Sequence, residues 1–134
     1  LWTGFAALLW LPLAGILYSL EAGAGWLSSP IALGRAPLHA IAVGLLGGII
    51  LAMATRVSRG HSGRPLRMDR LELTAFLILQ LAAVSRVLAD TPLAGAHRPE
   101  WLIAAGVLWL AAFLPWGWRY GRIYWAPRVD GAPG

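Results

Sequence analysis

The sequence predicts an all-α membrane protein whose chain crosses the bilayer four times. Of its 134 residues, 58% are hydrophobic and 13% are charged, and the mean hydropathy is +0.65. Soluble domains carry roughly 25% charged residues. The apolar residues also stand in four long blocks, and uninterrupted apolar stretches of about 20 residues are required by bilayers rather than by water-soluble cores.

The blocks define four predicted transmembrane helices, which cover residues 2–20, 38–55, 71–88 and 101–118. Each is close to the length that crosses about 30 Å of hydrocarbon at 1.5 Å per residue. Pro12 predicts a kink in the first helix, and Pro37 suits the first turn of the second. Because Leu1 opens inside an apolar run, we expect residues 1–134 to be the C-terminal part of one multi-pass membrane domain.

The arginines predict the orientation of the helices. All eleven basic residues are arginines, and they cluster in the connections between apolar blocks, which favours membrane topology over nucleic-acid binding. Residues 56–70 and 119–134 contain five and three arginines, whereas 21–37 and 89–100 contain one each. The positive-inside rule therefore places the 56–70 loop and the C-terminus in the cytoplasm.

The candidate metal ligands are histidines, and the absence of cysteine excludes a thiolate site and a cysteine nucleophile. Met53 is a possible soft ligand, with packing as the favoured alternative. Neutral imidazole is a common ligand for haem iron and copper. His39 lies at the edge of the hydrocarbon and is the first candidate, with a histidine bonded to a carbonyl or to water as the alternative. His61 is the second candidate, whereas His97 lies in an ordinary polar loop. No residue pattern predicts catalysis.

Small residues recur at every fourth position of the second predicted helix: Ala40, Gly44, Gly48 and Ala52. Such a stripe lets another helix approach closely. The alternative is that the groove also admits a flat macrocycle, with Gly44 and Gly48 as cofactor contacts.

Two polar residues stand within the third predicted helix. Arg86 has two interpretations: it binds an anionic group, such as a haem propionate, on the His39 side, or it pairs with Asp90 four residues later. Gln80 falls near the middle of the helix and predicts a hydrogen bond between helices.

The arginine-rich loop is predicted to be non-helical over residues 56–70, because Gly60, Gly63 and Pro65 interrupt it. One interpretation is a topology anchor that touches anionic headgroups. The other is a specific structure built by Arg56, Gly60, His61, Gly63 and Arg64, in which backbone N–H groups form an anion-binding nest.

Two segments carry a resemblance to a known family. The run HAIAVGLLGGIILAMATRVSRGHSGRPL, which starts at His39, and the ending YGRIYWAPRVDGAPG resemble the two signatures of the NnrS family in the right order. By motif, the corresponding positions are His39, Arg56, His61, Gly63 and Arg64. Position 59 is arginine here, where the family often has leucine.

The resemblance implies a bacterial inner-membrane protein that contains haem, of the b type, and copper, and that acts in the nitric oxide and nitrosative stress response. It also implies that the chain is about the last third of a protein of roughly twelve spans. The expected partners are then the missing N-terminal spans and the lipid bilayer. A multi-pass transporter, or a structural membrane module without a cofactor, is the alternative. A transporter would need membrane-embedded acidic residues along a path, and the acidic residues here sit at span ends.

Overall fold

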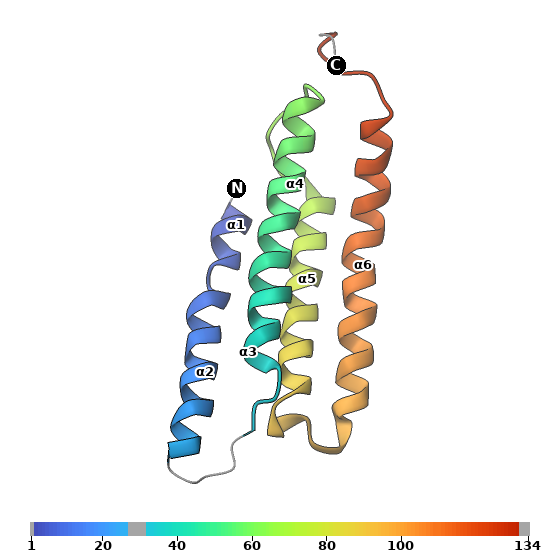
Figure 1. Ribbon diagram of the computed structural model, residues 1–134. Helices are drawn as coiled ribbons and strands as arrows, with labels where there is room; N and C mark the ends of the chain where they lie inside the picture. Colours follow the sequence, from blue (N-terminus) through green and yellow to red (C-terminus); the bar gives the residue numbers. More distant parts are fainter. Residues whose placement is uncertain (1, 27–31, 132–134) are drawn as a thin grey trace.

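The structure, a computed structural model, describes residues 2–26 and 32–131 as a bundle of helices that run up and down beside one another (Figure 1). These residues contain no strand. Four helical stretches are long and apolar enough to cross a membrane: Trp2–Trp26, Ala36–His61, Arg70–Ala89 and Pro92–Tyr124. The predicted all-α fold with four spans is therefore confirmed.

The first span consists of α1 (Trp2–Ala7) and α2 (Trp10–Trp26), which are separated by a turn. Pro12 has no N–H to donate to the carbonyl of Leu8. That carbonyl instead accepts a bond of 3.0 Å from Leu11 N–H, so the predicted kink is present, close before the proline. The helix continues to Trp26, whereas the sequence predicted its end near residue 20.

The second span is one continuous helix made of α3 (Ala36–His39), η1 (Ala40–Gly47) and α4 (Gly48–His61). Pro37 occupies its first turn, as predicted. The segment η1 is a π-helix, which the sequence did not predict. The prediction that residues 56–70 are non-helical is wrong for 56–61, because no proline occurs before Pro65 and Gly60 is tolerated inside the helix.

Gly63 ends α4 by adopting a backbone conformation that side chains disfavour. Its φ is +71°, its N–H donates to Gly60 O at 3.2 Å, and Arg64 N–H donates to Arg59 O at 2.9 Å. These two bonds form a Schellman motif, which satisfies carbonyls at the end of the helix. Both N–H groups are therefore used by the helix end and do not form the anion-binding nest that the sequence suggested.

The third and fourth spans are α5 (Arg70–Ala89) and α6 (Arg98–Tyr124), joined by the short 3₁₀ segment η2 (Pro92–His97). A capping box starts α5: the Asp69 carboxylate accepts the Leu71 and Glu72 N–H groups, and Glu72 Oε2 accepts the Asp69 N–H at 2.9 Å. In Figure 1, α5 lies between α4 and α6.

The small-residue stripe packs against the first span. A Cβ atom placed on Gly44 would overlap the Trp10 ring, and one on Gly48 would lie 2.7 Å from the Ala7 Cβ. Trp10 Nε1 also donates to Gln80 Oε1 at 2.6 Å, so the predicted interhelical role of Gln80 is confirmed. The stripe thus provides close helix packing.

Candidate functional site

His39 is held in one orientation by the backbone of the preceding turn. Its Nδ1 lies 2.8 Å from the carbonyl oxygen of Arg35. A carbonyl can only accept, so Nδ1 carries the proton and the lone pair of the neutral ring is on Nε2. Nε2 has no hydrogen-bond partner among residues 2–26 and 32–131. Metal-ligating histidines commonly donate their other ring N–H to a carbonyl or carboxylate in this way.

Asp90 joins three helices beside His39. Its Oδ2 accepts from Arg86 Nη1 at 2.8 Å, its Oδ1 accepts from Arg98 Nη2 at 2.9 Å, and Oδ2 lies 3.7 Å from His39 Nδ1. The predicted Arg86–Asp90 pair is therefore confirmed. Burial by itself would raise the pKa of the Asp90 carboxyl, but the hydrogen bond from Arg98 and the charge of Arg86 outweigh it and hold the pKa below its ordinary value.

The lowered pKa of Asp90 predicts a loss of stability in acid. A carboxyl whose pKa is lower in the folded state stabilises that state above its ordinary pKa of 3.8, and the contribution disappears as the pH falls through the lowered value. Asp90→Asn is therefore expected to lower the Tm at pH 7, with a loss of about 1–3 kcal/mol, and its difference from the wild type should shrink as the pH falls below 3.8. Thermal unfolding of the purified protein across this pH range measures the difference.

The matched control is Glu100→Gln, because the Glu100 carboxyl is two-thirds exposed. We expect its Tm difference from the wild type to stay small at every pH. A Tm difference for Asp90→Asn that persists unchanged into acid would contradict the ionic role of Asp90.

His39 and Arg86 line one open groove between three helices, with a volume of about 320 Å³. The other residues that line it are mainly apolar: Val43, Ala82, Leu102, Ala105, Gly106 and Trp109. The structure thus brings together two of the four residues that the sequence named for a cofactor. The other two, Gly44 and Gly48, are covered by the first span instead.

His61 cannot share a metal ion with His39. The two residues stand at opposite ends of one helix, and 22 residues correspond to about 30 Å. His97 is 80% exposed and lies 3.9 Å from Glu100. In the described part of the chain, no group of three or more histidine, aspartate or glutamate side chains is placed to hold a metal ion.

A buried ionic network at the other end of the bundle was not predicted. Arg59 Nε donates to Glu72 Oε1 at 2.7 Å, and the Tyr120 hydroxyl donates to the same oxygen. Arg59 also donates to Pro65 O and to Asp69 Oδ2, both at 3.0 Å. Glu72 is fully buried. The network therefore ties α4, the loop and the start of α5 to α6.

The sequence did contain a signal for part of this network. Asp69 followed three residues later by Glu72 is a capping-box pattern, and the box places Glu72 in the first turn of α5. Burial would raise the pKa of Asp69, but the Glu72 N–H and the Arg119 and Arg59 guanidinium groups outweigh it and lower that pKa. Arg59 is the central donor of the network.

The C-terminal motif contacts the loop that follows α4. Val129 N–H donates to Ser62 O at 3.1 Å, and Arg128 Nη1 donates to His61 O at 2.9 Å. The Asp130 carboxylate covers Gly63, where an added Cβ would lie 2.6 Å from it. The two motif segments, far apart in sequence, therefore form one structural unit, which we call the C-terminal clamp (residues 61–63 with 128–130).

Gly63→Ala is expected to release the clamp. The substitution is strained at φ +71° and its Cβ would collide with Asp130, which together cost about 1–3 kcal/mol. Gly60→Ala is the control, since its Cβ would meet only Leu66 at 3.9 Å. Hydrogen exchange of residues 126–131 should rise in Gly63→Ala and stay unchanged in Gly60→Ala. Equal exchange in both variants would show that the clamp does not depend on Gly63.

The fold and these sites define a multi-pass α-helical membrane protein with a histidine-bearing groove at one end and the Arg59–Glu72 network and the C-terminal clamp at the other. A family model described as NnrS protein matches residues 1–128. The chain therefore belongs to the NnrS family. Comparisons with curated proteins and with solved structures found no match.

Proposed function

We propose that this chain forms part of a haem-binding membrane protein of the nitric oxide response, in which His39 would hold the iron of a b-type haem. The observation that carries the proposal is the geometry of His39. Its Nδ1 is fixed on the Arg35 carbonyl, Nε2 has no partner within residues 2–26 and 32–131, and the ring lines a largely apolar groove. A haem held there would supply an iron centre that can bind nitric oxide.

The charges beside His39 suit a haem carboxylate. Arg86 and Arg98 both pair with the single carboxylate of Asp90, which leaves one net positive charge at this end of the groove. Arg86 is therefore proposed to orient a propionate while Asp90 holds the guanidinium in place. The groove is open on one side, and we propose that the missing N-terminal spans provide its remaining wall.

Copper is a less specific part of the proposal. His61 is exposed at the opposite end of the bundle and is the remaining candidate ligand for copper. Further copper ligands would have to come from outside the described residues. We also propose a location in the bacterial inner membrane, and the arginine distribution supports an orientation with residues 56–70 and the C-terminus in the cytoplasm.

The test is an absorption spectrum of the full-length protein, purified from membranes and reduced. We expect a Soret band and reduced haem bands in the wild type, and a haem content reduced at least several-fold in His39→Ala. His97→Ala is the control, because His97 is exposed outside the groove. Full haem content in purified, folded His39→Ala would remove His39 from the site.

A structural module without a cofactor is the second candidate. It is favoured by the packing of Trp10 and Ala7 against Gly44 and Gly48, which uses the small-residue stripe for helix contacts. This candidate predicts a colourless wild-type protein despite adequate haem supply, so the same spectrum distinguishes the two.

A further inference from the structure

We propose that the groove between α1 and α4 binds an anionic phospholipid, with one acyl chain along the groove and the phosphate at Arg56. The groove has a volume of about 250 Å³ and is lined by Gly4, Phe5, Leu8, Ile49, Ala52, Met53 and Arg56. Every lining residue except Arg56 is apolar or glycine. The phosphate end of this site, at Arg56, lies 17 residues along the second span from His39, and the groove shares no lining residue with the proposed haem groove.

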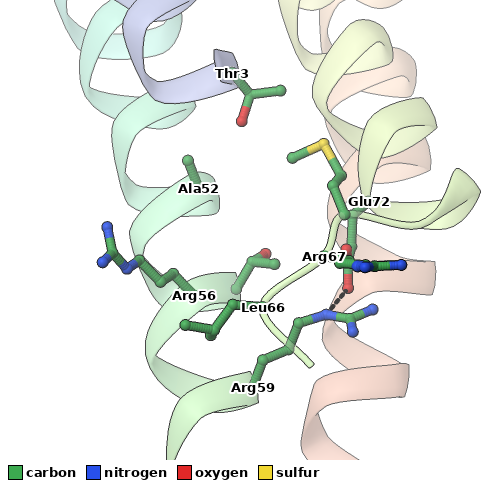
Figure 2. A pocket seen from close by; sticks show the side chains of 9 residues that line it. Thr3, Ala52, Arg56, Arg59, Leu66, Arg67 and Glu72 are labelled. Carbon is green, nitrogen blue, oxygen red and sulfur yellow. Dashed lines mark hydrogen bonds and ion pairs between the residues drawn. The ribbon is translucent and has the colours of Figure 1, made fainter. Parts of the chain in front are cut away.

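The Arg56 guanidinium group can bind a phosphate, and its side chain points away from the carboxylates that would neutralise it. Figure 2 shows Arg56 and Arg59 leaving α4 on opposite sides, with Arg59 toward Glu72 and Arg56 away from it. Arg59 is neutralised by Glu72 and Asp69. The side chain of Arg56 makes no ion pair or hydrogen bond within the described residues, and a guanidinium group binds phosphate oxygens through paired N–H donors.

The depth of Arg56 in the bundle matches the headgroup region. Aromatic side chains of α6 contact α4 at the same level: Trp116 Nε1 donates to Thr55 Oγ1 at 2.8 Å, and the Tyr124 hydroxyl lies 2.6 Å from Ser58 Oγ. Tryptophan and tyrosine gather at membrane–water interfaces. Ile49, seven residues earlier, is about 10 Å deeper, so the apolar part of the groove runs into the acyl-chain region.

Two cavities adjoin the groove at Arg56. One, of about 320 Å³, is also lined by Met53, His61 and Arg128 and extends toward the C-terminal clamp. The other is a small cavity of about 30 Å³ that contains the Thr3 and Thr55 side chains (Figure 2). Thr3 is 7% exposed, and its hydroxyl is a buried group without a hydrogen-bond partner in the described structure. A hydrated headgroup has room in the larger cavity, and the small one has room for about one water molecule beside the Thr3 hydroxyl.

The charge at this end favours an anionic lipid over a zwitterionic one. Residues 56–70 carry five arginines, and their one aspartate, Asp69, is occupied by Arg59 and Arg119. Glu72, the carboxylate next to the small cavity, pairs with Arg59. Each arginine near an anionic lipid surface contributes roughly 1 kcal/mol, which corresponds to about a fivefold change in affinity.

The first experiment is native mass spectrometry of the full-length protein, delipidated in detergent and titrated with phosphatidylglycerol or phosphatidylcholine. We expect one phosphatidylglycerol to bind in preference, with about fivefold weaker binding in Arg56→Gln and weaker binding in Gly4→Leu, which fills the groove. Arg122→Gln is the matched control, because Arg122 stands at the same end of the bundle and lines none of these cavities.

Equal losses in Arg56→Gln and Arg122→Gln would overturn the proposal, because they would indicate attraction by net charge alone. Equal binding of both lipids by the wild type would overturn it too. Helical content by circular dichroism confirms that each variant is folded.

A second measurement identifies what covers the groove. Met53→Cys introduces a single thiol into residues 1–134, which contain no cysteine, and any cysteine elsewhere in the full-length protein is replaced by serine. A photoreactive group attached at position 53 then reports its neighbour in native membranes. We expect adducts with phospholipid. Adducts with another span of the protein, or with a second copy, would show that protein occupies the groove and would overturn the proposal.

Discussion

Arg59→Ala is expected to destabilise the folded protein by about 3–5 kcal/mol, more than any other single substitution proposed for this bundle. The substitution leaves the fully buried Glu72 carboxylate without its guanidinium partner. It also removes the donors to Pro65 O and Asp69. Thermal unfolding in detergent, followed by circular dichroism, measures the loss as a fall in Tm.

The control for this prediction is Arg122→Ala, which removes an arginine outside the network and is expected to change the Tm little. The double variant Arg59→Met/Glu72→Leu should recover part of the stability, because it removes the unpaired buried charge, while the Tyr120 hydroxyl and the Asp69 N–H lose their acceptor. A Tm for Arg59→Ala equal to that of the control would mean that Glu72 finds water or another donor, and the network would not be a stabilising element.

Gly44→Ala is expected to separate the first span from the second. Its Cβ would overlap the Trp10 ring, so the ring must move and its hydrogen bond to Gln80 is broken or stretched. Overpacking of this kind costs about 1–3 kcal/mol, and a buried amide that loses its partner adds to it. We expect a lower Tm and a change in tryptophan emission as Trp10 loses its hydrogen bond to Gln80 and its packing against Gly44.

The matched control is Gly15→Ala, because nothing lies within 4 Å of its Cβ position. Alanine has a higher helix propensity than glycine, so this variant should be neutral or slightly more stable. An unchanged Tm and emission spectrum in Gly44→Ala would indicate that Trp10 has free space on another side.

The sequence predicted the number of spans well because bilayer thickness imposes block length. It placed the helix ends less well, since charged residues can continue a helix beyond the hydrocarbon. The second span shows this clearly: its apolar part ends near Thr55, but the hydrogen-bonded helix ends at His61. The residue that stops it is Gly63, and its positive φ follows from contact with Asp130 and the local cap, which no hydropathy pattern contains.

The candidate site was predicted in part. The sequence places His39, Arg86 and Asp90 close together for two reasons. Arg86 and Asp90 are four residues apart on one helix, and the start of the second span lies on the same side of the membrane as the end of the third. The Arg59–Glu72–Tyr120 network could not be predicted, because it depends on the rotation of α6 against α5. Gly44 was correctly recognised as a point of close approach, but only the structure shows that Trp10 occupies it.

The π-helical segment η1 could not be predicted from the sequence for a similar reason. Its glycines are compatible with either helix type, and the choice depends on what packs against them. Because η1 directly follows His39, the wider turn sets the rotation of that histidine relative to α4. The groove at His39 thus depends on a backbone feature without a sequence signature.

The C-terminal clamp also constrains how many times the chain crosses the membrane between its two segments. Ser62 and Val129 are hydrogen-bonded, so both must lie on one side of the bilayer. An even number of crossings must then separate them, and α5 and α6 provide two. His39 and Asp90 also lie close together, at the opposite side of the bilayer, so an even number of crossings separates them as well. Here α4 and α5 provide the two crossings. Given that α5 spans the membrane, these two polar contacts require α4 and α6 to span it as well, each in the direction opposite to α5.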